Sequence, residues 1–102
     1  MLPMPRVMFT ISYQIKPEMR EQYLGLVRRM KTQMRDVAGK TYSVYETKGK
    51  GNHFTEVFVT ATMEEYEALE DNQDETTQEL VRKLEECVDT GGMRYSTLIE
   101  LE

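Results

Sequence analysis

The sequence predicts an α+β fold in which one four-stranded antiparallel sheet carries helices on one face. Four segments have the alternation, or the β-branched and aromatic composition, that is typical of strands. Two stretches repeat apolar residues at helical spacing, and the second of them is interrupted by turn-forming residues. Together with the turn and capping residues between them, these segments give the order β-α-β-β-α-β.

The first strand and the first helix have the clearest patterns. Met8 to Ile15 alternates, and its apolar face consists of Phe9, Ile11, Tyr13 and Ile15. A helix is expected from Pro17, because a proline at the first helical position has no N–H that would need an intrahelical partner. Gly39 is expected to end this helix. The apolar stripe of the helix recurs over about five turns and consists of Met19, Tyr23, Leu26, Val27, Met30, Met34 and Val37.

A hairpin is expected next. Tyr42 to Thr47 and His53 to Thr60 have strand composition, and the loop Lys48-Gly49-Lys50-Gly51-Asn52 separates them, so the two strands should pair antiparallel. A glycine–lysine loop can also bind an anion through its backbone N–H groups. This loop leads into a strand, so it has no helix N-terminus behind it, and a plain turn is favoured over an anion site.

The second helical stretch is predicted in two pieces. Thr62-Met63-Glu64-Glu65 has the spacing of a capping box and opens a short helix through Tyr66 and Leu69. After the turn-forming segment 71–74, Thr76-Thr77-Gln78-Glu79 offers a second box, and Thr90-Gly91-Gly92 is expected to end the helix. Met93 to Leu101 then alternates as a last strand. The apolar stripe of the second piece consists of Leu80, Val81, Leu84, Cys87 and Val88.

This order of elements is that of a ferredoxin-like sandwich. Two right-handed crossovers place the first and third strands in the centre of the sheet, and both helices then cover the same face. The 102 residues are expected to form one domain over residues 1–102, because two cores would each be too small.

Composition narrows the class of function. The net charge of −5 argues against nucleic-acid binding and against an anionic membrane surface. The sequence has no apolar run long enough to cross a bilayer, and its N-terminus does not resemble a secretory signal. The single cysteine, Cys87, excludes an internal disulfide and is read as a small apolar core residue. We therefore expect a cytoplasmic protein.

The sheet face without helices leads us to expect a homodimer. Both sets of side chains on the third strand mix apolar and polar residues, and Leu98 stands among Arg94, Ser96 and Glu100 on the last strand. Such a face is too apolar to be left in water and too polar to be simple core. Two copies that pack these faces together in a symmetric pair would cover both.

The chain resembles the dimeric α/β-barrel superfamily, which includes antibiotic-biosynthesis and haem-degrading monooxygenases. The resemblance runs from Met8 to Leu101 and is carried by Ile15-Lys16-Pro17, by Ala38-Gly39-Lys40-Thr41-Tyr42 and by the segment from Phe54 to Leu69. It implies two sheets facing each other across a dimer, a pairing that forms the α/β barrel, and a pocket between the sheet and helices of each protomer. Oxygenase members tend to carry a tryptophan where this chain has Thr60 and an asparagine where it has Glu56.

Glu56 and Tyr66 are the candidate catalytic residues. A carboxylate within an apolar strand must face a pocket, a dimer partner or a cation, because burying it unpaired is costly. In a dry pocket its pKa would rise and it could act as a general base. The alternative for Glu56 is an ion pair with Arg94 or with a helical arginine, or exposure at the open face of the sheet. Tyr66 lies where some members of the superfamily that the chain resembles carry a helical tyrosine.

Thr10, Ser12, Thr60 and His53 are the candidate ligand-binding residues. Thr10 and Ser12 belong to a polar line on the first strand that could bind a ligand or hydrogen-bond across a dimer. His53 could act as a general base or a metal ligand, and a solvated histidine at the end of a strand is the alternative. No other histidine is present to share a metal, so we expect neither a metal site nor a cofactor.

Two functional hypotheses follow. In the first, the protein is a homodimer that binds a small aromatic or apolar ligand between sheet and helices, with a cofactor-independent monooxygenase-like activity as one candidate. In the second, it is a non-catalytic dimeric module. A preformed cavity of a few hundred Å³, in the range of roughly 300–1,000 Å³ of ligand sites, favours the first, and a filled core with an ion-paired Glu56 favours the second.

Overall fold

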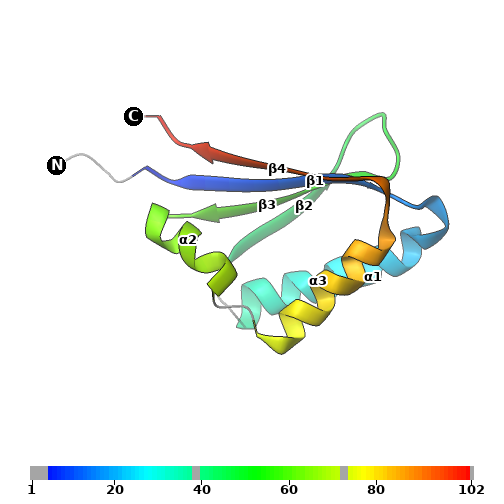
Figure 1. The fold of residues 1–102 in the computed structure, drawn as a ribbon, viewed down its shortest axis with the longest axis horizontal. Coiled ribbons are helices and arrows are strands. Elements are labelled where there is room, and N and C mark those ends of the chain that lie inside the picture. Colours follow the sequence, from blue (N-terminus) through cyan, green and yellow to red (C-terminus); the bar gives the residue numbers. More distant parts are fainter. Residues whose placement is uncertain (1–4, 38–39, 72–73, 102) are drawn as a thin grey trace.

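A computed structural model describes residues 5–37, 40–71 and 74–101, and its elements follow the predicted order. The strands are β1 (Val7–Ile15), β2 (Thr41–Glu46), β3 (His53–Thr60) and β4 (Val88–Ile99). They form one sheet in the order β2-β3-β1-β4, with every neighbouring pair antiparallel. The first and third strands are therefore central, as the sequence predicts. The helices lie on one side of the sheet, and the start of β1 and the end of β4 lie at the end of the sheet opposite the β2–β3 loop (Figure 1).

The first helix is confirmed, with an irregular turn at each end. A 3₁₀ turn at Pro17–Met19 leads into α1 (Arg20–Lys31), and a π-helical segment (Thr32–Val37) continues it. The Thr32 hydroxyl donates to the carbonyl of Arg28 at 3.2 Å where the regular helix ends, a contact by which threonines compete with backbone bonding. The predicted stop at Gly39 lies outside the described residues.

The second helical stretch is in two pieces, α2 (Met63–Asp71) and α3 (Glu75–Cys87). The Thr62 hydroxyl accepts the backbone N–H of Glu65 at 3.1 Å, as a capping box requires. The predicted box at Thr76 is wrong, because the carboxylate of Asp74 caps α3 by accepting the N–H of Thr77 at 2.7 Å.

The start of the last strand also differs from the prediction. Val88 and the glycines Gly91 and Gly92 belong to β4 rather than to the end of a helix. The pairing of β1 with β4 shifts register between Tyr13 and Ile15, so a bulge accommodates the extra length. Gly92 has a φ of +75°, a backbone conformation that glycine adopts without a steric penalty.

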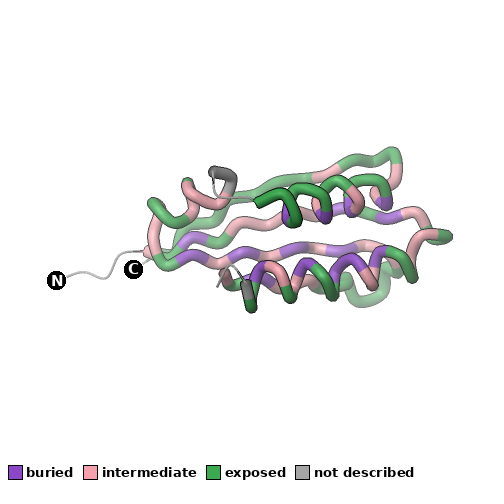
Figure 2. The backbone as a smooth tube through the Cα atoms, turned by 90° about the horizontal axis from the view of Figure 1, so that it is seen from below, coloured by how far each residue is buried: buried purple, intermediate pink, exposed green. Residues whose placement is uncertain are grey.

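The core lies between the sheet and the helices. Figure 2, seen from the helix side, shows buried positions recurring along the central strands and along the inner sides of the two long helices. Alternation sends Tyr13, Phe54 and Phe58 to this side, whereas Met8 and Leu98 lie on the opposite face, 38% and 53% exposed. The core consists of Tyr13, Ile15, Tyr23, Leu26, Val27, Met30, Met34, Tyr42, Phe54, Phe58, Leu80, Leu84 and Cys87.

The β2–β3 hairpin is fastened to the start of α1. Arg20 binds both carboxylate oxygens of Glu46, at 2.6 and 3.0 Å, and also donates to the side-chain oxygen of Asn52 at 3.0 Å. Glu46 in turn accepts the backbone N–H of Asn52, which has a φ of +67°. These contacts lower the pKa of Glu46 to about 2, chiefly through the hydrogen bond from Arg20. The loop geometry that sets the hairpin register is therefore held by side chains.

Among the described residues, no helix is long and apolar enough to span a membrane.

Two glycine-to-alanine substitutions should change stability in opposite directions. Gly92→Ala places a side chain at a positive φ and should lower the free energy of unfolding by about 1 kcal/mol. Gly25→Ala, within α1, meets no atom within 4 Å and should raise it by about 1 kcal/mol through helix propensity. Urea unfolding measures both values. If both substitutions changed the free energy of unfolding by the same amount in the same direction, the positive φ of Gly92 in β4 would be contradicted.

Candidate functional site

Glu56 lies in the middle of β3 with its side chain turned toward the helices. It pairs with Ile11 of β1 on one side and with Val44 of β2 on the other. Its neighbours on the same face of β3 are the core residues Phe54 and Phe58. The side chain is only 4% exposed, so an ionisable group stands within the apolar core.

Tyrosine hydroxyls surround this carboxyl group. Tyr42 donates its hydroxyl proton to Glu56 Oε1 at 2.6 Å, and Tyr13 and Tyr23 share a hydrogen bond of 2.7 Å between their hydroxyls. Burial raises the pKa of Glu56, and hydrogen bonds from Tyr42 and Tyr13 partly offset that rise. Burial likewise raises the pKa of all three tyrosines, so they remain protonated donors.

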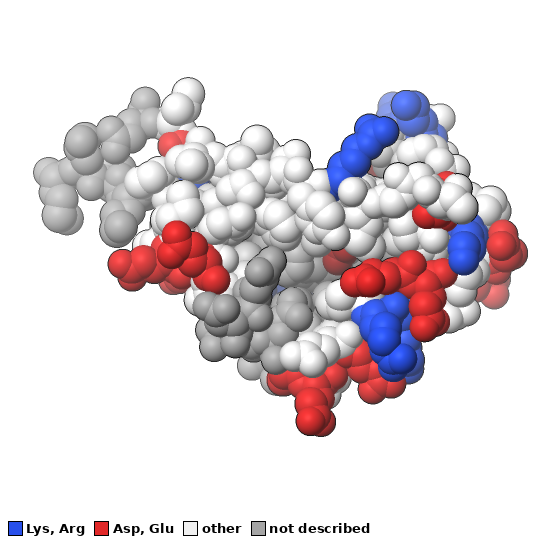
Figure 3. Space-filling view, in the orientation of Figure 1, with Lys and Arg blue, Asp and Glu red and all other residues white. Residues whose placement is uncertain are grey.

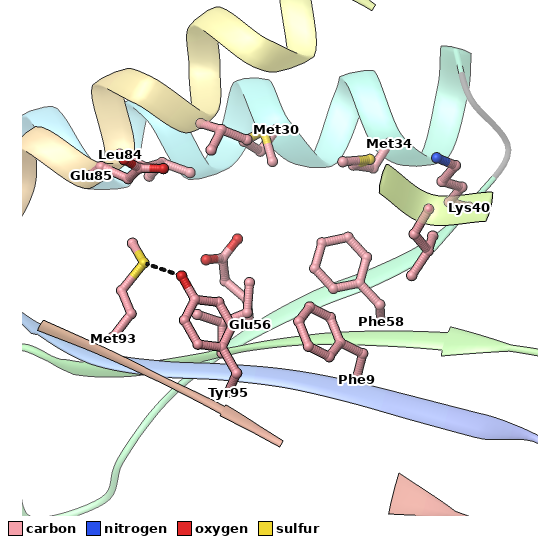
Figure 4. A pocket seen from close by; sticks show the side chains of 13 residues that line it. Phe9, Met30, Met34, Lys40, Glu56, Phe58, Leu84, Glu85, Met93 and Tyr95 are labelled. Carbon is pink, nitrogen blue, oxygen red and sulfur yellow. Dashed lines mark hydrogen bonds between the residues drawn. The ribbon is translucent and has the colours of Figure 1, made fainter. Parts of the chain in front are cut away.

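An apolar cavity of about 220 Å³ adjoins Glu56 between the sheet and the helices. In Figure 4 the carboxylate rises from β3 toward the helices, with Lys40 on one side of it and Met93 on the other. Glu85 and Tyr95, both exposed, also line the cavity and mark where it reaches solvent. Aromatic and thioether side chains contribute to the wall, from Phe9, Phe58, Tyr95, Met30, Met34 and Met93.

The arrangement suits a proton transfer. A carboxyl group with a raised pKa is a better base than an ordinary carboxylate, and the apolar wall excludes competing water. Flexible methionine side chains adapt to differently shaped ligands. The candidate site is therefore a general base at the wall of an apolar cavity.

The ion pair considered as an alternative for Glu56 is absent. Arg94 pairs with Ser12 across the strands and lies on the other face of the sheet, and Arg20 is engaged by Glu46. Within residues 5–37, 40–71 and 74–101, no salt bridge reaches Glu56. Its charge is moderated by neutral hydroxyls, which leaves it free to exchange a proton.

The other residues singled out on the helix side do not line this cavity. The Tyr66 ring packs edge-on against Phe9 with centroids 5.9 Å apart, and its hydroxyl shares a hydrogen bond of 2.9 Å with Thr97. Thr60 is buried and donates to the carbonyl of Thr62 at 3.0 Å, at the turn between β3 and α2. Both residues fasten the region between β3, α2 and β4.

Thr10, Ser12 and His53 lie on the opposite face of the sheet from Glu56. Ser12 shares a hydrogen bond of 3.0 Å with Thr55, its partner across the strands. The His53 ring lies 3.2 Å from the carbonyl of Gly51 in the hairpin loop. The candidate residues are thus divided between two faces, and their roles as ligand-binding residues stay predictions.

Tyr42 and Lys40 are not among the candidate catalytic or ligand-binding residues that the sequence predicts. The predicted hairpin loop contains a signal for Tyr42, because the register that it sets places Tyr42 diagonally across from Glu56. For Lys40, no sequence signal indicates that it lines the cavity. In the described part of the chain, no group of three or more His, Cys, Asp and Glu residues is placed to hold a metal ion.

Solved structures share this fold. A conserved protein from Methanosarcina mazei Go1 aligns with a TM-score of 0.78 and 17% identity, over 93% of this chain and 92% of that one. A proposed antibiotic biosynthesis monooxygenase from Caulobacter crescentus CB15 aligns with a TM-score of 0.80 and 9% identity, over 97% of this chain and 92% of that one. SnoaB, a cofactor-independent oxygenase from Streptomyces nogalater, aligns with a TM-score of 0.71 and 10% identity, over 91% of this chain and 90% of that one.

These similarities show the fold. The chain has the ferredoxin-like α+β fold of the antibiotic-biosynthesis-monooxygenase-like structures, as the resemblance in its sequence predicts. No family model and no curated protein matches the sequence.

The raised pKa of Glu56 predicts a particular dependence of stability on pH. Because the folded protein holds this proton more tightly than the unfolded chain, the contribution of Glu56 is fully present below its unfolded pKa, about 4.3, and is lost as pH rises through the folded pKa. Wild-type protein should therefore lose stability relative to Glu56→Gln between pH 4.5 and 8, as measured by urea unfolding.

Glu46→Gln is the matched control. The pKa of Glu46 is lowered to about 2, so its contribution is present above its unfolded pKa and is lost only in acid. The stability difference between wild type and Glu46→Gln should be flat from pH 5 to 8. A flat difference for Glu56→Gln as well would show that Glu56 does not hold its proton in the folded state.

Proposed function

We propose that this protein binds a small aromatic or apolar molecule in the cavity beside Glu56 and removes a proton from it, as a homodimer with cofactor-independent monooxygenase-like activity. The observation that carries the proposal is a buried carboxyl group without a cationic partner in the described part of the chain, facing an apolar cavity. Glu56 is the base, and Tyr42 orients it.

The cavity volume of about 220 Å³ is below the range of about 300–1,000 Å³ that is usual for sites of small molecules, so it limits the size of the ligand. An engineered apolar cavity of about 150 Å³ in another protein binds benzene. The cavity of about 220 Å³ is therefore suited to a molecule of one or two rings. Phe9, Phe58 and Tyr95 offer ring contacts, which favours an aromatic ligand.

The oxygenation is written for a substrate with an acidic CH₂ group beside its ring. Glu56 takes one proton, and the carbanion passes an electron to O₂. Combination of the two radicals and return of the proton give a hydroperoxide, which loses water to leave a carbonyl group. The balance is CH₂ + O₂ → C=O + H₂O, in which the substrate carbon supplies the electrons. The shared fold with SnoaB, a cofactor-independent oxygenase, supports this choice of reaction.

The homodimer would form through the sheet face that carries no helix. An apolar patch lies at the end of this face away from the hairpin, where Met8 of β1 stands between Val59 of β3 and Leu98 of β4. Met8 and Leu98 are exposed, and large exposed apolar side chains on a sheet are costly to leave in water. A second copy packed on the same patch would cover both surfaces by two-fold symmetry.

The proton-transfer proposal is tested with 2-indanone, a two-ring ketone with acidic CH₂ groups. Titration should shift NMR signals of residues that line the cavity, and the protein should accelerate exchange of the CH₂ protons in D₂O. Glu56→Gln should keep binding and lower the protein-catalysed exchange about a hundredfold or more, the usual contribution of a positioned base. Consumption of O₂ by bound substrates then tests the oxygenation separately.

Glu67→Gln, an exposed carboxylate on α2, is the control and should exchange like wild type. Absence of any binding by one- and two-ring probes would favour the non-catalytic dimeric module. Binding with undiminished exchange in Glu56→Gln would remove Glu56 from the base role.

The dimer is tested by Leu98→Arg, which places a charge in the patch and should give monomers at micromolar concentration in sedimentation velocity. Leu101→Arg is the control, because Leu101 is 91% exposed beyond the end of β4, and it should sediment like wild type. A monomeric wild-type protein would refute the proposed dimer directly.

A further inference from the structure

The sheet face without helices has a polar hollow of about 520 Å³ at the end where the β2–β3 hairpin projects. We call it the hairpin hollow, and it lies on the opposite face of the sheet from the carboxylate of Glu56. Its volume is within the range of about 300–1,000 Å³ that is usual for sites of small molecules. The cavity beside Glu56 does not account for it, since the two have no lining residue in common.

The strand register brings the polar side chains of the hairpin hollow together. Thr55, Ser12 and Arg94 form one row across β3, β1 and β4, and His53 and Gln14 form the next row. Cross-strand neighbours on one face stand about 4.5–5.5 Å apart between Cβ atoms. Residues from three strands therefore reach the same small volume.

Three basic side chains line the hairpin hollow: Arg94, Lys50 and His53. Within residues 5–37, 40–71 and 74–101, Arg94 and Lys50 take part in no salt bridge. The one acidic side chain of the lining, Asp89, already accepts the backbone N–H of Gly91 at 2.8 Å. The hollow therefore has a local excess of unpaired positive charge.

This local charge contrasts with the rest of the molecule. The chain carries a net charge of −5. In Figure 3, acidic side chains gather over the helices with some basic ones among them, whereas basic side chains stand out at the upper right of the molecule, where the β2–β3 loop projects. A basic site in an acidic protein concentrates small anions locally.

The hydrogen-bonding groups of the hollow also suit an anion. Arg94 offers a planar fork of donors, which matches carboxylate and phosphate oxygens. The carbonyl of Gly51 can only accept, so the His53 nitrogen beside it, Nδ1, carries a proton and Nε2 is directed elsewhere. Nε2 is therefore the ring nitrogen that can contact a bound group.

We propose that the hairpin hollow is a second binding site, which takes a small molecule bearing a carboxylate or phosphate group and holds that group with Arg94, Lys50 and His53. This site does not depend on the cavity beside Glu56. It also leaves the apolar patch around Met8 and Leu98 free for a second copy, because that patch lies at the other end of the same face.

The experiment is a titration of ¹⁵N-labelled protein with inorganic phosphate and, separately, with succinate, at constant ionic strength held with chloride. Saturable shifts should centre on residues of the hairpin hollow. The tighter of the two probes identifies the preferred oxyanion. Arg94→Gln should weaken binding about tenfold, the effect of losing a hydrogen bond to a charged group, and Lys50→Gln should weaken it by a smaller factor.

Arg28→Gln on α1 is the matched control, because it makes the same change of charge on the helix side, and it should bind like wild type. Sedimentation of Arg94→Gln shows whether a change of assembly accompanies the loss. Lack of saturation by both probes up to tens of millimolar, or equal weakening by Arg28→Gln and Arg94→Gln, would overturn the proposed site.

Discussion

The hydrogen bond from Tyr42 to Glu56 is the interaction on which the candidate site depends. An ionised carboxylate in the core costs several kcal/mol unless it is well solvated by the protein. In the described part of the chain it has hydroxyl donors and no cation, so the cost is moderated but not removed. A group held in this state can take or release a proton with little rearrangement. The same residue in an ion pair would be fixed in its charged form.

The position of Glu56 follows from the topology of the sheet. β3 has β2 on one side and β1 on the other, so both strand edges beside Glu56 are paired and its side chain can only face the helices or the uncovered side of the sheet. On the helix side it meets Tyr42 from β2 and Tyr13 from β1. The strands β1, β2 and β3 thus each supply a residue to the site, which is why a break in the pairing of β3 with either neighbour would reach it.

Much of this could be predicted from the sequence. Alternation and turn residues predict the element order, and a loop at Lys48–Asn52 leaves Thr47 opposite His53, where their backbones bond at 2.9 Å. Counting back from that pair places Val44 beside Glu56, and Tyr42 diagonal to it. The cavity could not be predicted, because its volume depends on how far the helices stand from the sheet. Which face of β3 the helices cover could not be predicted either. One face carries Phe54 and Phe58 and the other carries Val57 and Val59, so both faces are apolar enough to be the buried one.

The hairpin register assigns neighbouring residues of β3 to different sites. Glu56 faces the cavity and Thr55 faces the hairpin hollow, so a slip of one residue would exchange them. Arg20, Glu46 and Asn52 prevent such a slip by fixing the loop at a positive φ and joining it to α1. This clamp lies outside the lining of the cavity, yet it decides which side chains line it. The clamp therefore fixes the arrangement of both faces of the sheet. A substitution in it would affect the cavity beside Glu56 and the hairpin hollow together, although the two share no lining residue.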